Sequence, residues 1–240
     1  MTRTFTSLST FIVLFVSLAV EANAGLIGQS TEMKMGRSAA QQIEQTYTVS
    51  NDPYLTRMVR DIGLDLAKYC ERQKVDWTFK VLEVKDVNAV SVPGFVYVNQ
   101  GLIEFVRGDR DELAAVIGHE IGHTADRHAV KQVQKSMMGG VLVSLLLKGS
   151  AANVANLFTN LAMLGYSRKD EYEADLTGLS LVSKAGYDPQ GVVRFFTMLQ
   201  EKEKHDPSKL ETYFRTHPPT KERIKRAQAE IDRLKQDAPK

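Results

Sequence analysis

One short segment, residues 119–123 with the sequence His-Glu-Ile-Gly-His, constrains the fold of this chain more than any other feature. Residues four positions apart lie on the same face of an α-helix, so the two histidines can approach a single metal ion. Asp109 suits the N-cap of that helix, and Glu112 completes a capping box. We therefore predict one helix that continues to about Gln134. Four apolar residues surround the motif on this helix: Leu113, Val116, Ile117 and Ile121.

His119 and His123 are of the residue type that binds catalytic zinc, and we predict that they hold one Zn²⁺ per chain. Glu120 follows the first ligand and projects beside the metal, not onto it. This position suits a general base that takes a proton from zinc-bound water, whose pKa the metal lowers to about 7, and passes it to the leaving amine. Sites of this composition also accept other divalent ions, and zinc is inferred from the ligand types alone.

Catalytic zinc keeps three protein ligands and one open position, so the pair requires a third ligand. Glu171 and Asp175 lie four residues apart in a predicted helix at about residues 169–184. We expect Glu171 to bind the metal, and Asp175 to accept a hydrogen bond from the far nitrogen of a ligand imidazole. Glu173 is the competing ligand, and a solvated acidic run is the alternative. His128 does not fit an extended histidine motif, and we expect it to be exposed at a helix end.

The remaining sequence predicts a mainly helical fold with a small sheet. Helix formers and periodic apolar positions, with proline or glycine at several ends, predict further helices at about residues 32–44, 53–71, 189–204 and 219–235. β-Branched and aromatic runs at 79–84 and 95–98 predict strands, the second after a turn at Pro93 and Gly94.

The N-terminus has the pattern of an export signal. Arg3 precedes an apolar run at 11–20, and small residues at 22–24 fit a cleavage site. We therefore predict a cleaved signal peptide at 1–24 and a single domain at 25–240. An uncleaved anchor is the alternative, although the run is shorter than the roughly 20 residues of a spanning helix.

A second apolar stretch, residues 137–147, contains two adjacent glycines and is followed by small and amide residues up to 160. It is too short to span a bilayer. A buried helix, a loop and a peripheral contact with a membrane surface remain alternatives for it.

Composition narrows the classes of function. A hydrophobic share of 43% and a charged share of 25% are ordinary for a globular domain that buries its own core. The 31 basic and 29 acidic residues give a net charge of +2, and a nucleic-acid partner is not expected because it would require a basic excess on one face. Cys70 is the single cysteine, which excludes an internal disulfide.

The combination of His-Glu-x-x-His at 119–123 with Glu-x-x-Ala-Asp at 171–175 resembles the M48 family of zinc peptidases, which includes bacterial envelope proteases and CAAX-type prenyl-protein endopeptidases. The segment at 32–41 resembles the family's N-terminal helix, and Thr-His-Pro-Pro at 216–219 resembles its C-terminal signature. The similarity extends from residue 32 to 224. Because no long apolar segment follows the predicted signal, the chain resembles the soluble periplasmic branch.

This resemblance implies an α+β fold, namely a mainly helical zincin-like (gluzincin) domain with a small mixed β-sheet and an active-site helix that carries the motif. It implies Glu120 as the base and three zinc ligands: His119, His123 and Glu171. It also implies that His217 and Arg223 approach the site from the C-terminal region. Either would stabilise the oxyanion of the tetrahedral intermediate.

Asn88, Ala89, Pro93 and Gly94 belong to a segment that resembles the family's edge strand. An extended peptide can add to an exposed sheet edge through main-chain hydrogen bonds, which would hold a substrate for cleavage with little sequence selectivity. An ordinary core strand is the alternative.

The function implied by the resemblance is a zinc-dependent endopeptidase of the periplasm, acting on unfolded or misassembled envelope proteins. A latent protease is one alternative, in which His217 or the segment around 139–160 occupies the open zinc position. A non-catalytic, zinc-containing, chaperone-like binding module is another, although the intact Glu120 argues against it. The sequence does not determine the oligomeric state.

Overall fold

A computed structural model describes residues 27–72, 74–138, 165–217 and 221–237. The predicted signal peptide at 1–24, nearly all of the stretch at 137–160 and the predicted helix start at Pro219 lie outside these residues. Those three remain predictions. Within the described residues, no helix combines the length and the apolar character needed to cross a membrane.

A mixed three-stranded sheet forms the β part of the fold. β1 (Thr78–Leu82) runs parallel to β3 (Phe95–Asn99), which pairs antiparallel with β2 (Ala89–Val92), giving the order β1-β3-β2. The turn between β2 and β3 contains Gly94 with φ 87°, a left-handed conformation that glycine adopts without steric cost. The expected small mixed sheet is confirmed. The strand predicted at 95–98 is β3, in the centre of the sheet, and β2 lies outside it.

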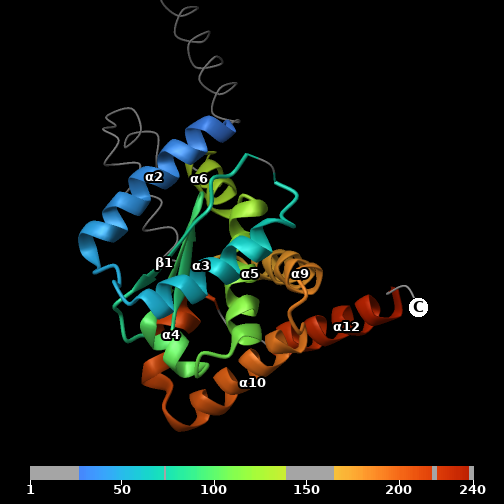
Figure 1. Cartoon of the computed structure of the whole chain (residues 1–240). Helices are drawn as coiled ribbons and strands as arrows, with labels where there is room; N and C mark the ends of the chain where they lie inside the picture. Colours follow the sequence, from blue (N-terminus) through green and yellow to red (C-terminus); the bar gives the residue numbers. More distant parts are fainter. Residues whose placement is uncertain (1–26, 73, 139–164, 218–220, 238–240) are drawn as a thin grey trace, which may run out of the picture.

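α5 (Arg110–Ala125) is the central helix and is buried over most of its length. It packs against α9 (Arg168–Lys184), α10 (Gln190–His205), α3 (Pro53–Ala67) and the sheet. Figure 1 shows α5 enclosed by these elements. A helix covered on all sides carries apolar residues around its circumference, and this explains the apolar surroundings of the motif.

Side-chain caps fix the starts of the two helices that carry the motif residues. Asp109 accepts hydrogen bonds from two backbone N–H groups in the first turn of α5, as its predicted role as N-cap requires. Glu112 lies 3.5 Å from Arg194 Nε, an ion pair that the sequence did not suggest. Ser167 and Asp170 form a reciprocal capping box at the start of α9.

α5 and α9 approach closely because small residues meet where they cross. A Cβ on Gly122 would lie 2.7 Å from the carbonyl oxygen of Ala174, and one on Gly178 would lie 2.7 Å from the backbone nitrogen of His119. Larger residues at these positions would force the helices apart. The small side chain of Ala174 likewise permits this close packing.

The prediction of one helix from the Asp109 cap to about Gln134 is wrong. α5 ends at Ala125, and α6 (His128–Met138) starts in a new direction. Between them Arg127 has φ 59°, a left-handed conformation that costs a non-glycine residue roughly 1–2 kcal/mol. Tertiary contacts of this arginine offset the cost.

Those contacts centre on Glu32 of α2 (Gln29–Thr46), whose side chain is 1% exposed. Arg72 Nη2 lies 2.6 Å and Arg127 Nε 2.9 Å from Glu32 Oε2. Arg72 Nη1 also donates to the carbonyl oxygen of Thr124 in the last turn of α5. The network therefore links α2 to the C-terminal end of α5.

The other elements complete the shell around α5. Short helices that the sequence did not predict are α4 (Gln100–Phe105), the 3₁₀ helix η1 (Pro207–Leu210) and α11 (Glu211–Thr216). α12 (Lys221–Asp237) packs on α9 and α10, and Figure 1 shows it at the opposite end of the domain from α2. α2 and α6 cover a second, smaller apolar cluster with residues of the sheet. The expected mainly helical α+β class is confirmed.

Candidate active site

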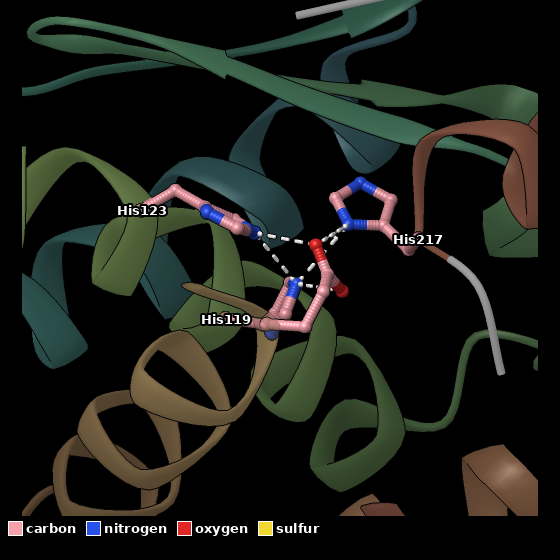
Figure 2. Close-up of side chains that lie close together, drawn as sticks. His119, His123 and His217 are labelled. Carbon is pink, nitrogen blue, oxygen red and sulfur yellow. Dashed lines mark hydrogen bonds and ion pairs between the residues drawn. The ribbon is translucent and has the colours of Figure 1, made fainter. Parts of the chain in front are cut away.

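Four buried side chains from three parts of the chain meet beside the sheet. His119 and His123 come from α5, Glu171 comes from the first turn of α9, and His217 follows α11. One potential ligand atom from each lies within 4.8 Å of the others. Figure 2 shows the three histidine rings turned toward one another. The structure thus brings together the three predicted zinc ligands and His217.

The donor atoms of this cluster fit a metal ion. His119 Nε2 and His123 Nε2 lie 2.9 Å apart, and each is within 3.5 Å of a Glu171 oxygen. Burial lowers the pKa of both imidazoles, which favours unprotonated rings. Lone pairs and a carboxylate crowded together away from water repel one another unless a cation lies among them. Two imidazole nitrogens and a carboxylate are a donor set of catalytic zinc.

Asp175 lies behind the cluster, one turn after Glu171 on α9. Its Oδ1 is 2.9 Å from His119 Nδ1, so it accepts the proton of the nitrogen that faces away from the cluster. Arg223 Nε and Nη2 both donate to Asp175 at 2.7 Å, and Arg223 Nη1 lies 2.9 Å from Glu171 Oε2. Burial opposes the charge of Asp175, but the arginine lowers its pKa to about 2. Arg223 therefore forms ion pairs with both carboxylates, Glu171 and Asp175.

Glu120 lies beside the ligand cluster and is 2% exposed. Its Oε2 accepts a 2.7 Å hydrogen bond from Ser91 Oγ of β2, and its Oε1 lies 3.3 Å from His217 Nε2. Burial would raise the pKa of Glu120, but the charge of His217 and the hydrogen bond to it lower this pKa to about 2. The carboxylate is therefore ionised at neutral pH. Sequence reasoning missed Ser91, because only the strand pairing places it next to the motif.

Comparison with known protein families agrees with this geometry. The sequence matches the model of peptidase family M48 over residues 51–231. The chain belongs to peptidase family M48. The prediction of an M48 metallopeptidase is thereby confirmed at the level of the family.

The chain is also similar in sequence to several proteins that are named as proteases. The beta-barrel assembly-enhancing protease of Escherichia coli K12 is 26% identical over 222 residues, which are 87% of this chain and 45% of the relative. The metalloprotease LoiP of the same organism is 31% identical over 213 residues, 83% of this chain and 79% of the relative. The mitochondrial metalloendopeptidase OMA1 of Arabidopsis thaliana is 35% identical over 153 residues, 63% of this chain and 31% of the relative. The chain spans less than half the length of the first and the third.

His217 lies between the candidate ligands and the candidate base Glu120. Its Nδ1 lies 3.2 Å from His119 Nε2 and 3.3 Å from Glu171 Oε1, while its Nε2 faces Glu120. Burial opposes the charge of His217, but the two facing carboxylates raise its pKa to about 10. The ring of Tyr213 packs against it, with centroids 5.3 Å apart.

The predicted substrate-strand residues lie at β2 and in its turn. Asn88 and Ala89 are at the start of β2, and Asn88 Oδ1 accepts a hydrogen bond from the Thr216 hydroxyl at 3.4 Å. Pro93 and Gly94 form the turn that follows, and Pro93 packs against the helix α2. β2, and not the central strand, runs past the candidate base.

The expectation that His128 is exposed is wrong. His128 is 1% exposed and its Nδ1 lies 3.0 Å from His123 Nδ1. The turn at Arg127 redirects the chain, so that His128, the first residue of α6, lies next to His123. Glu173, the competing ligand, lies outside the cluster and contacts His128 Nε2 at 3.2 Å.

Proposed function

We propose that this M48 chain is a zinc-dependent endopeptidase of the bacterial cell envelope that hydrolyses peptide bonds of unfolded or misassembled proteins. The position of Glu120 carries the proposal. Its carboxylate lies next to the His119 and His123 donors but outside their cluster, and it is held by Ser91 and His217. A buried, ionised carboxylate beside a metal site is what a general base requires.

The side chains divide the chemistry among them. Zinc, when bound by His119, His123 and Glu171, supplies a Lewis acid that polarises the substrate carbonyl and makes water more acidic. Glu120, with a pKa of about 2, is in the form that accepts the proton of the attacking water and returns it to the leaving amine. His217, with its pKa raised to about 10, is a charged donor suited to an oxyanion that develops beside it.

The sheet supports a binding mode for extended substrates. Among the described residues, β2 pairs with β3 on one side and has no strand partner on the other. A substrate backbone added to that side would run alongside Ser91 and hence next to Glu120. Main-chain pairing of this kind favours unfolded segments over folded ones. The Escherichia coli relative named for enhancing β-barrel assembly supports an envelope substrate and the periplasm as the location.

Degradation of casein by the purified protein tests the proposal. Wild type should cut casein, and Glu120→Gln should lose at least about 100-fold in rate while it retains one zinc per chain. Glu83→Gln, at an exposed position, is the matched control and should retain wild-type activity. An active Glu120→Gln variant would exclude this residue as the base. Zinc bound without cleavage by wild type would leave a latent protease or a non-catalytic binding module.

A latent protease is the second candidate, and the place of His217 favours it. Its Nδ1 lies within the ligand group, 3.2 Å from His119 Nε2, where a fourth ligand would close the open position of the metal. The variant His217→Ala distinguishes a role of His217 as a closing metal ligand from a role as an oxyanion donor. Removal of a closing ligand should increase the rate of casein cleavage, whereas removal of an oxyanion donor should lower it by about 100- to 1,000-fold.

A further inference from the structure

The second nitrogen of the ligand His123 has an unusual partner. Because His123 Nε2 faces His119 Nε2 and Glu171, its lone pair is directed at the metal position, and its proton must be on Nδ1. That Nδ1 lies 3.0 Å from Nδ1 of His128. Two ring nitrogens form a hydrogen bond only if one donates and the other accepts, so His128 Nδ1 is the acceptor.

The second ring nitrogen of His128, Nε2, faces two carboxylates. With Nδ1 accepting, the proton of His128 is on Nε2, which lies 3.2 Å from Glu173 Oε2 and 3.8 Å from Asp170 Oδ1. The side chain of His128 is fully buried, so water does not replace these partners. Glu173 is partly exposed, and Lys131 and Lys169 each lie 3.5 Å from its carboxylate.

We propose that His128 is a positioning residue for the metal ligand His123, which it connects to Glu173 through successive hydrogen bonds of its two ring nitrogens. His128 thereby holds His123 in the tautomer with Nε2 free for the metal and fixes the plane of its ring. Tyr166 stacks on one face of the His123 ring, with centroids 4.0 Å apart, while His128 contacts the ring at its Nδ1 edge. The proposal rests on the metal centre proposed above and not on the protease activity.

The two ligand histidines are thus held differently. His119 Nδ1 contacts the carboxylate of Asp175 directly, whereas His123 Nδ1 is connected to the carboxylate of Glu173 through the imidazole of His128. His128, Asp170 and Glu173 also resemble a second metal site by composition. Their geometry instead favours the hydrogen-bonded connection from His123 through His128 to Glu173, which we call the relay. His128 already makes a hydrogen bond through each nitrogen, and two lysines face Glu173.

Two substitutions at His128 test the proposal on the full-length protein. His128→Leu fills the space but offers no acceptor, and His128→Asn places an amide oxygen near the former Nδ1. His205→Leu removes an exposed histidine and is the control. Zinc affinity is measured by competition with a chromophoric chelator. The visible spectrum of the Co²⁺-substituted protein reports the ligand geometry.

We expect His128→Leu to bind zinc about 10- to 100-fold more weakly and to alter the Co²⁺ spectrum, and His128→Asn to restore most of the affinity and the spectrum. The control should match wild type. Wild-type affinity and spectrum in His128→Leu would overturn the proposal. So would an equal loss in both variants, since it would show that packing and not the acceptor matters. Two zinc ions per wild-type chain, with one lost in His128→Leu, would replace the relay by a second metal site.

These measurements require no cleavage of substrate. A wild-type protein that binds zinc but leaves casein intact would therefore contradict the proposed function. Weaker zinc binding by the His128→Leu variant in the same experiment would still support the relay.

Discussion

Gly178→Ala should weaken zinc binding as well as destabilise the fold. The new Cβ would lie 2.7 Å from the backbone nitrogen of His119 and 2.8 Å from the carbonyl carbon of Gly118, whereas ordinary contact begins at 3.4 Å. Both neighbours are backbone, so relief requires α5 and α9 to separate by about 0.7 Å. Overpacking costs about 1–3 kcal/mol, and the higher helix propensity of alanine offsets about 1 kcal/mol. The net loss in unfolding free energy is therefore about 0–2 kcal/mol.

The metal site should also be sensitive to this separation, because His119 is on α5 and Glu171 is on α9. Metal–ligand distances tolerate only about 0.2 Å, so we expect zinc affinity to fall at least about 10-fold. Chelator competition measures the affinity, and thermal unfolding should show a Tm lower by up to about 8 °C. Leu176→Ala, at a side chain 45% exposed on the same helix, is the control. Zinc affinity within about 2-fold of wild type, together with the lower Tm, would refute the reasoning.

Three further substitutions have distinct expected results. Ser91→Ala removes a donor to the Glu120 carboxylate and should lower kcat on casein about 10-fold with KM nearly unchanged; a change confined to KM would contradict this role. Arg223→Lys keeps the charge but loses the bidentate contact with Asp175, so zinc affinity should fall. An unchanged zinc affinity in chelator competition would contradict this role of Arg223. Glu32→Gln leaves two arginines without their buried carboxylate and should cost about 3–5 kcal/mol in urea unfolding; a loss below about 1 kcal/mol would show that the network is dispensable.

The helices that carry the motifs were predictable because their signals are local. The cap at Asp109 and the four-residue spacing of His119 and His123 depend only on neighbouring residues. The spacing of Glu171 and Asp175 likewise predicts a shared helix face. The structure places these residues as that spacing requires, with the carboxylates directed at the histidines.

The rest of the site depends on contacts between residues distant in the sequence. His128 is buried because Arg127 adopts a left-handed conformation, and that conformation relies on a glutamate 95 residues away. Ser91 meets Glu120, 29 residues further along the chain, only after β2 has paired with β3. No local pattern marks either position, since a buried histidine and a buried serine look like surface residues in the sequence.

The ligand cluster is assembled from segments that come together late. His119 lies 98 residues from His217, and Glu171 lies 46 residues from it. Contacts of such sequence separation close long loops and therefore form slowly. A chain in the course of folding offers only the two histidines of α5, too few to hold a catalytic metal. The enzyme would therefore be unable to cleave its own unfolded copies until its tertiary structure is complete.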